Sequence, residues 1–333
     1  MKERLFGTMP DGTPVTEWTL SNHHFTVEIL SYGGRIKRLV AFGTDVVCGF
    51  DTLEEYLRDV SYQGALVGRV ANRISGGRLH VEGKDYQLAL NAGDGTVHLH
   101  GGEVGYSHRV WECTDVGPDH LSLHLVSPDG EENYPACLTL DVTYTLTDEG
   151  LGMEYRATSD GTTPVNLTNH AYFNLAGCRG ESILPYLAWI NADYYTALNE
   201  LLLPVADLPV DGTSFDFRQK RPIGTPMEAG YDNNFRLLHT VTEEVGGKTL
   251  PLVATVENGA LRFKLYTDQP CMQFYIGNAL CDPLPFRGGV EQIPHTTFCM
   301  EAQIRPDSPT HGEGFLHAGE VYTQSTFYAF ERL

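Results

Sequence analysis

The chain has 333 residues, 41% of them hydrophobic, and its 23 lysines and arginines are outnumbered by 43 aspartates and glutamates, which gives a formal net charge of −20. The hydrophobic fraction allows a sizeable core, while length alone would suggest two domains. The strong negative charge argues against nucleic acids and anionic membranes as partners, and it disfavours phosphorylated substrates unless cations cluster locally. We therefore expect a neutral small molecule as the ligand.

Segments with strand-like alternation follow one another from the start of the chain. Two strands are predicted at residues 25–29 and 36–42, where apolar side chains recur at every second position. One helix is predicted over residues 51–59, because Asp51 or Thr52 can cap the backbone amides of its first turn. The first part of the chain is therefore predicted as β-structure with a single short helix.

The later segments continue this pattern. Alternation is clearest over residues 138–146, and it repeats over residues 151–157 after a turn. The other predicted strands are a hairpin at 79–90 and segments at 109–115, 120–126, 261–267, 272–278, 296–304 and 321–331. Residues 191–235, rich in Asp, Pro and Gly, are predicted to form long loops. No linker, repeat or charge block is visible, so we expect an all-β fold, a large antiparallel β-sandwich, in one domain over residues 1–333.

The N-terminal segment and the cysteines predict a cytoplasmic location. Residues 1–7 lack the apolar run of a signal peptide, and no stretch of the sequence is apolar enough to span a bilayer. The seven cysteines form no CxxC pair and lie mostly within apolar runs: Cys48, Cys113, Cys137, Cys178, Cys271, Cys281 and Cys299. We therefore expect reduced thiols and no disulfide framework.

The segment around residues 166–175, read as a strand, has two different faces. One face is apolar apart from an asparagine: Val165, Leu167, Asn169, Ala171, Phe173 and Leu175. The other consists of uncharged hydrogen-bonding groups around one titratable side chain: Asn166, Thr168, His170, Tyr172 and Asn174. Such a face suits a concave site that binds a polyhydroxylated ligand while the imidazole of His170 transfers a proton. A buried, hydrogen-bonded histidine in a polar layer of the core would show the same pattern.

Glu301 is a carboxylate inside the apolar run of a predicted strand, between Met300 and Ala302. Partial burial would raise the pKa of this carboxyl group and make it an effective proton acceptor. The alternative is a structural carboxylate that accepts hydrogen bonds from backbone amides. Glu301 is therefore a second candidate for proton transfer.

Two further segments carry cationic groups. Arg69 and Arg73 lie four residues apart with Asn72 beside the second, and guanidinium donors match vicinal hydroxyls or a carboxylate. Ion pairing in an acidic protein is the alternative. His98 and His100 would share one face of a strand before a glycine turn, but no third ligand follows at a typical spacing, so no metal is predicted.

Asp232 and Gln273 are the remaining candidates for ligand binding. Asp232 lies in the turn-rich segment 230–235, and Gln273 lies beside aromatic residues in segment 273–278. A carboxylate and an amide can each hydrogen-bond to sugar hydroxyls. Turn formation by Asp232 and aromatic packing around Gln273 are the alternatives.

Taken in order, these segments resemble the aldose 1-epimerase (galactose mutarotase) family, from the turn at Gly33–Gly34 to the C-terminal strand. The matching motifs are GRVANRI at 68–74, LHGG at 99–102, NLTNHAYFNL at 166–175, GYDNNF at 230–235, QFYIGN at 273–278 and MEAQ at 300–303. Many members of the family have a histidine where this chain has Asn233 in the fourth of these motifs.

The resemblance implies a large antiparallel β-sandwich with an open cleft. It also implies an isomerase that interconverts the α and β anomers of aldohexoses such as galactose and glucose, without a cofactor. His170 would be the general acid and Glu301 the general base. The residues implied to hold the sugar hydroxyls are Asn72, Arg73, His100, Asp232 and Gln273. We expect a monomer or a homodimer.

Three other functions are compatible with the residues. A glycoside hydrolase could use Glu301 and Asp232 as its two carboxylates. A non-catalytic domain could bind galactose or glucose and leave the sugar unchanged. A hexose-phosphate epimerase would need a cationic phosphate pocket, which the net charge of −20 makes less favourable.

Overall fold

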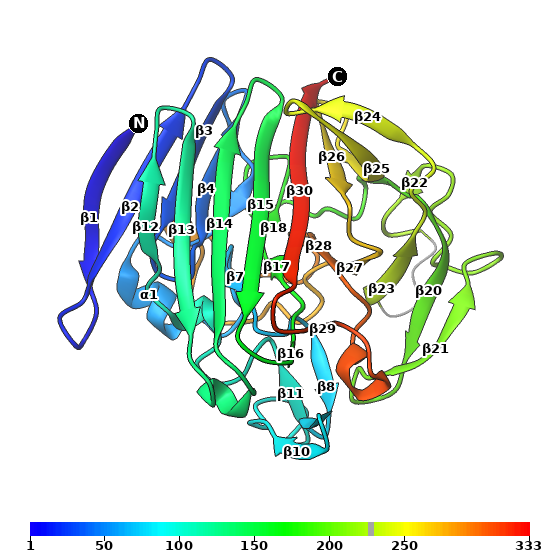
Figure 1. The fold of residues 1–333 in the computed structure, drawn as a ribbon. Helices are drawn as coiled ribbons and strands as arrows, with labels where there is room; N and C mark the ends of the chain where they lie inside the picture. Colours follow the sequence, from blue (N-terminus) through cyan, green and yellow to red (C-terminus); the bar gives the residue numbers. More distant parts are fainter. Residues whose placement is uncertain (226–229) are drawn as a thin grey trace.

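The computed structural model describes residues 1–225 and 230–333, and in it the chain is an all-β protein, as predicted (Figure 1). The largest sheet has ten strands, and the C-terminal strand lies near its middle, between β15 and β26. Its order is β12 (Glu112–Val116), β13 (His120–Ser127), β14 (Leu138–Leu146), β15 (Gly150–Ser159), β30 (Val321–Arg332), β26 (Leu261–Thr267), β25 (Lys248–Glu257), β19 (Leu187–Ile190) and β22 (Arg221–Pro222), with β24 (Thr242–Val245) paired to β25.

Two five-stranded sheets and several short pairs lie against this large sheet. The first runs in the order β1 (Lys2–Thr8), β2 (Pro14–Ser21), β3 (Phe25–Leu30), β4 (Ile36–Ala41) and β5 (Thr44–Asp45). The second runs β21 (Pro204–Pro209), β20 (Ala192–Leu198), β23 (Asp232–Leu237), β27 (Cys271–Tyr275) and β28 (Cys299–Gln303). The short pairs are β6 (Val47–Cys48) with β18 (Tyr172–Phe173), β7 (Leu66–Val67) with β17 (Thr168–Asn169), β8 (Arg73–Ser75) with β11 (Val97–Leu99), β9 (Arg78–Val81) with β10 (Lys84–Gln87), and β16 (Thr163–Pro164) with β29 (Phe315–Leu316).

Aromatic side chains join the layers. Phe173 on β18 lies 4.8 Å, between ring centroids, from Phe263 on β26 and 5.1 Å from Tyr328 on β30. Phe298, just before β28, packs against Phe173 with ring centroids 5.6 Å apart and the planes tilted by 30°. All four side chains are buried, and aromatic rings of this size contribute much of the hydrophobic stabilisation of a core. These contacts pack β18 and the residue just before β28 against strands β26 and β30 of the large sheet.

Helical structure is limited to short pieces. The predicted helix is confirmed as α1 (Leu53–Arg58), and Thr52 caps it through a reciprocal pair of hydrogen bonds with Glu55. Four 3₁₀ turns occur in the described residues: η1 (Tyr106–His108), η2 (Glu131–Asn133), η3 (Arg287–Gly289) and η4 (Ser308–His311). Among the described residues, no helix has the length and apolar character needed to cross a membrane.

The prediction of one continuous strand around residues 166–175 is wrong. The segment contains only β17 and β18, each two residues long, and they pair with different partners, β7 and β6. Between them the backbone of His170 bonds instead to the loop at Gly64 and Ala65. Hydrogen bonding to two separate segments, residues 64–67 and β6, interrupts the strand, although its apolar face does enter the core.

The prediction of long loops over residues 191–235 is also wrong for the parts of that range that form strands. It contains β20, β21, β22 and the first residues of β23. β21 begins and ends with prolines, which are tolerated there because it is the outermost strand of its sheet. Residues 226–229, which fall within the predicted loops, lie outside the described residues.

The cysteines correct a further prediction. Cys48 and Cys178 form a disulfide, while the other five cysteines are free. Cys48 lies on β6, opposite Tyr172 of β18, and Cys178 follows shortly after β18 in the chain. The pairing of β6 with β18 brings together two residues 130 positions apart, which sequence spacing could not reveal.

We predict that reduction, or Cys178→Ser, lowers the free energy of unfolding by about 2–4 kcal/mol. The bond closes a long loop, so its loss returns chain entropy to the unfolded state. Urea unfolding with and without reductant measures the change, and Cys137→Ser, which removes a free thiol, should leave the effect of the reductant intact. Thiol titration of the denatured, unreduced protein should find five groups, and a count of seven would contradict the disulfide.

Candidate active site

A cleft with a volume of about 400 Å³ is lined by every side chain that the sequence predicted for the site. These are Asn72, Arg73, His100, His170, Asp232, Gln273 and Glu301. The rest of the lining consists of Val60, Ser61, Tyr62, Leu99, Tyr172, Leu202, Tyr275, Ala279, Leu280, Cys281, Asp282 and Gln292. The predicted residues come from six separated segments of the chain, so the fold assembles the cleft from distant parts.

One wall of the cleft is formed by the polar face of the β23–β27–β28 sheet. Glu301 on β28 pairs in register with Gln273 on β27. The Nε2 amide of Gln273 donates a hydrogen bond to Oδ1 of Asp232, at 2.8 Å. Because side chains alternate along a strand, Met300 and Ala302, the neighbours of Glu301, point the other way. The alternation predicted around Glu301 therefore holds.

The opposite wall carries His170, between β17 and β18. Its backbone N–H donates to the carbonyl of Ala65, and its own carbonyl accepts from the N–H of Gly64, both at 2.9 Å. These two bonds hold the residue between the two short strands, so that its side chain enters the cleft.

The pairing of β18 with the residues before β28 places the two walls. Phe173 and Phe298 exchange both of their backbone hydrogen bonds, at 2.8 and 3.0 Å. In an antiparallel pair, a residue three positions before Phe173 falls opposite a residue three positions after Phe298. These positions are His170 and Glu301. The register therefore sets the imidazole opposite the carboxylate.

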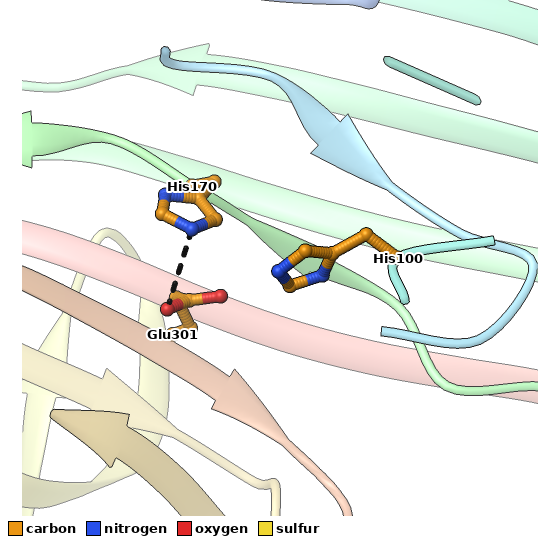
Figure 2. Close-up of side chains that lie close together, drawn as sticks. All are labelled: His100, His170 and Glu301. Atoms are coloured by element: carbon orange, nitrogen blue, oxygen red, sulfur yellow. Dashed lines mark ion pairs between the residues drawn. The ribbon is translucent and has the colours of Figure 1, made fainter. Parts of the chain in front are cut away.

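His170 and Glu301 form a buried, closely spaced pair (Figure 2). Nε2 of His170 lies 3.7 Å from Oε1 of Glu301, and the side chains are only 7% and 3% exposed. Burial lowers the pKa of His170 to about 4. Burial, reinforced by the charge of Asp232 and opposed by Arg73, raises the pKa of Glu301 well above its usual range. Desolvation therefore disfavours the charged forms of both groups, so that a proton shared by the pair is favoured on Glu301 over His170.

Asn72 and His100 are linked by two backbone-anchored hydrogen bonds. The N–H of Asn72 donates to Nδ1 of His100 at 3.1 Å, and the N–H of His100 donates to the carbonyl of Asn72 at 3.0 Å. Both residues have positive φ angles, 64° and 51°, a left-handed conformation that costs free energy for residues other than glycine. Figure 2 shows the outer edge of the His100 ring directed toward His170 and Glu301.

Arg73 and Asp232 face each other across the cleft. Nη2 of Arg73 lies 3.8 Å from Oδ2 of Asp232, and their side chains are 15% and 24% exposed. Both groups therefore keep part of their hydrogen-bonding capacity for a ligand. A partly exposed ion pair of this kind contributes little free energy by itself, so a ligand can displace it at low cost.

Two tyrosines pack on the imidazoles. The ring of Tyr172 stacks on His170 with centroids 5.0 Å apart and planes 18° apart. Tyr62 stacks on His170 at 6.1 Å and meets His100 edge-on at 4.6 Å. Sequence reasoning missed Tyr62, for which the only signal was its place shortly before the GRVANRI motif, and it did not assign a role to Tyr172 or Tyr275.

A buried ion pair supports the loop that carries Tyr62. Nη1 of Arg35 donates to Oδ2 of Asp59 at 3.0 Å, and both side chains are fully buried. Asp59 also accepts hydrogen bonds from the backbone N–H groups of Ser61 and Gln63, on either side of Tyr62. Since Tyr62 itself has a φ of 59°, this network holds it in a conformation that it would otherwise disfavour.

Several polar residues singled out from the sequence are structural. Arg69 is buried and donates to the hydroxyls of Ser127 and Thr163 and to the backbone carbonyls of residues 127, 128, 135 and 136. Asn166 bonds to the backbone of Ala71 and Ile304. Asn174 holds the backbone at residues 176, 181 and 296 in the same way. The polar face predicted around His170 therefore contributes only His170 and Tyr172 to the cleft.

His98 and His100 do not act together, contrary to the shared strand face that was predicted. His98 bonds to the carbonyl of Ala89 at 2.8 Å and to the hydroxyl of Tyr134 at 2.6 Å, away from the cleft. His100 lies beyond the end of β11, and its left-handed backbone redirects its side chain. One ligand atom each from His100, His170 and Glu301 lies within 4.8 Å of the others, which is the composition of a small metal site.

Comparison with known proteins agrees with the motifs. The profile of the aldose 1-epimerase family matches residues 16–329. Galactose mutarotase of Mus musculus is 39% identical, with 98% of this chain and 97% of that protein covered, and aldose 1-epimerase of Escherichia coli K12 is 33% identical, with 96% of each covered. The crystal structure of galactose 1-epimerase from Lactobacillus acidophilus has a TM-score of 0.85 at 28% identity, covering 100% of this chain and 99% of that one.

We predict that Asp59→Asn destabilises the protein by about 3 kcal/mol or more, because it leaves the Arg35 guanidinium buried without its counter-charge. The free energy of urea unfolding measures this effect. Asp211→Asn is the matched control, since Asp211 pairs with Arg218 at the surface and its side chain is 83% exposed. The control should unfold like the wild type. Equal stabilities for the two variants would show that the buried pair does not hold the loop.

Proposed function

This chain belongs to the aldose 1-epimerase family, and from that premise we propose that it is an isomerase that interconverts the α and β anomers of aldohexoses such as galactose and glucose. The observation that carries the proposal is the buried pair of His170 and Glu301, 3.7 Å apart in a cleft lined by uncharged and weakly paired polar groups. A proton donor and a proton acceptor this close match the two adjacent oxygens of a hemiacetal carbon.

Anomer exchange requires two proton transfers between oxygen atoms. The ring opens when a base removes the proton of the anomeric hydroxyl while an acid protonates the ring oxygen. Rotation about the C1–C2 bond then presents the other face of the aldehyde. The ring closes when the base returns its proton to the carbonyl oxygen and the acid takes its proton back from the former ring oxygen. No electron pair leaves the sugar and no carbon–hydrogen bond breaks, so we propose that the reaction needs no cofactor.

We assign the base role in ring opening to Glu301 and the acid role to His170. With one proton shared between them, the pair can take a proton from one sugar oxygen and deliver one to the other. Burial alone favours the uncharged arrangement in the empty cleft, with the proton on Glu301. A sugar hydroxyl that donates to the carboxylate would stabilise its charged form and move the proton toward His170. Each group is expected to contribute about 10²–10⁴-fold to the rate.

The pH dependence follows from the single proton of the pair. In the free protein the acid limb should lie near pH 4, where a second proton binds to His170. The alkaline limb should lie well above the usual pKa of a carboxyl group, where the last proton leaves. Because the two groups are coupled, each limb reports the pair and not one residue alone.

The remaining cleft residues suit hydroxyl binding, and we propose that role for Asn72, Arg73, His100, Asp232 and Gln273. Arg73 supplies donors, Asp232 supplies acceptors, and Gln273 offers an amide oxygen that has no hydrogen-bond partner among the described residues. This mixture is suited to neutral, polyhydroxylated ligands. The anomeric carbon would lie between His170 and Glu301, and this position determines which residue binds each of the other hydroxyls.

The cytoplasmic location and the monomeric or dimeric state remain proposals. The disulfide between Cys48 and Cys178 is of the kind that persists in oxidising compartments, whereas the other cysteines are free thiols. Thiol titration of the protein isolated from its native source under alkylating conditions would therefore test the location together with the bond.

We predict that the protein accelerates the approach of freshly dissolved α-D-galactose and α-D-glucose to their equilibrium optical rotation, measured by polarimetry. The final rotation should be the same as without the protein, because an isomerase changes only the rate. Appearance of new reducing ends from glycosides would indicate a hydrolase, and sugar binding without faster mutarotation would indicate a non-catalytic domain. Faster exchange of the 6-phosphates than of the free sugars would indicate a hexose-phosphate epimerase.

We predict that Glu301→Gln and His170→Asn each lower kcat by at least about 10²-fold, with a much smaller change in KM. The double variant should be little worse than either single variant, since both groups act in the same step. By contrast, Arg73→Ala is expected to raise KM as well as lower kcat. Near-wild-type turnover in Glu301→Gln or His170→Asn would remove that residue from the mechanism.

A further inference from the structure

Two histidines that lie two residues apart in the chain, His98 and His100, carry opposite hydrogen-bond patterns. The Nδ1 atom of His98 faces the carbonyl oxygen of Ala89, at 2.8 Å. A carbonyl can only accept, so Nδ1 of His98 must carry the hydrogen, and its Nε2 accepts from the hydroxyl of Tyr134. The Nδ1 atom of His100 faces the backbone N–H of Asn72, at 3.1 Å. A backbone N–H can only donate, so this Nδ1 must be unprotonated.

We propose that His100 is locked as the neutral Nε2–H tautomer and donates that hydrogen, without transferring it, to the sugar oxygen that reacts between His170 and Glu301. The proposal rests on the anomer exchange proposed above. His100 is thereby distinguished from His170, which exchanges its proton, even though both imidazoles line the same cleft.

The backbone makes the tautomer difficult to change. Rotating the bare Nδ1 away from Asn72 would leave a buried N–H without an acceptor, and protonating it would bring two N–H groups face to face. Asn72 and His100 also share the second bond, from the N–H of His100 to the carbonyl of Asn72. Their left-handed backbone conformations are maintained by this reciprocal contact.

The groups around His100 also keep it neutral. Burial lowers the pKa of His100 well below its usual value, with smaller contributions in the same direction from His170, Arg73 and His98. Tyr62 covers its ring edge-on, and Glu301, whose burial favours the protonated form, is the acidic member of the group of three. A neutral imidazole in such surroundings can polarise an oxygen without acting as an acid.

This role fits the charges that anomer exchange creates. As the ring opens, negative charge develops on the oxygen that becomes the aldehyde and the ring oxygen gains a proton from His170. A fixed N–H directed at this region would stabilise the developing charge, and it would require no reorganisation at the moment of reaction. No bond to hydrogen breaks at His100 in this step, so its contribution should not titrate over the working pH range.

The same tautomer argues against metal binding at this group of three. A metal ion coordinated by Nε2 of His100 would force the hydrogen onto Nδ1, against the N–H of Asn72. The ligand atoms of His100, His170 and Glu301 are close enough for a metal, but the hydrogen on His100 occupies the lone pair that would bind it.

The first test is nitrogen NMR of the ¹⁵N-histidine-labelled protein in the absence of sugar, with the His100 signals assigned by their loss in His100→Gln. We expect His100 to show an unprotonated Nδ1 and a protonated Nε2 from about pH 6 to pH 8, because burial lowers its pKa. His98 is the internal reference, and it should show the opposite tautomer. An Nδ1–H form or an imidazolium at His100 would overturn the proposal.

The second test uses two amide substitutions with crossed properties. In His100→Gln the amide nitrogen takes the place of Nε2, so the donor in the cleft is kept while the acceptor for Asn72 is lost. In His100→Asn the amide oxygen can take the place of Nδ1, so that acceptor is kept while the donor in the cleft is lost. We expect His100→Gln to melt at a lower temperature but to keep kcat within about tenfold, and His100→Asn to melt near the wild type but to lose about 10²-fold in kcat.

Both limbs of the pH profile of kcat/KM should remain in His100→Gln, because His100 does not titrate in the reaction. Loss of a limb, or equal losses of kcat in the two variants, would contradict the donor role. Zinc titration followed by calorimetry should detect no tight binding that depends on His100. If the protein fails to accelerate mutarotation while the NMR result holds, the proposed function is wrong and the tautomer stands. If mutarotation is fast but His100 carries Nδ1–H, only the present proposal fails.

Discussion

The candidate site depends on one pair of backbone hydrogen bonds, those exchanged by Phe173 and Phe298. They join segments 125 positions apart in the chain and fix the antiparallel register that sets His170 opposite Glu301. The aromatic rings of the same two residues pack on Phe263 and Tyr328 of the large sheet. Because the register is anchored in the core, a shift by one residue would turn the side chains of His170 and Glu301 away from each other and expose buried rings.

Near the Phe173–Phe298 pair, a polar cleft lies within a largely apolar interior. The walls are held by side chains that satisfy backbone groups, such as Asn166 and Asn174, whereas the cleft side chains keep unused hydrogen-bonding atoms. Oε2 of Glu301 and Nδ1 of His170 have no partner among the described residues. Groups left unsatisfied in this way are costly to bury, and a sugar bound between the two side chains would supply a partner for Oε2 of Glu301.

Burial also sets the chemistry of the two proton-transfer candidates. Desolvation moves the pKa of His170 and that of Glu301 in opposite directions, toward uncharged forms. A pair in which either group can hold the single proton suits a reaction that runs equally well in both directions. The supporting elements are rigid for the same purpose: Arg35 and Asp59 fix the loop of Tyr62, and Asn72 fixes the ring of His100.

The sequence by itself determined the fold class and most of the strands, because a period of two in apolar side chains survives whatever the strands pair with. It also singled out Glu301 and His170, which the structure places in one cleft, since a lone titratable group in an uncharged or apolar run is informative without any partner. Only the tertiary structure decided which similar residues serve the cleft. Arg69 and Arg73 look alike in sequence, as do His98 and His100, but one of each pair bonds to remote backbone and the other lines the cleft. The disulfide and the broken strand around His170 were likewise decided by partners far along the chain, because local patterns contain no information about which distant segment supplies a hydrogen bond or a thiol.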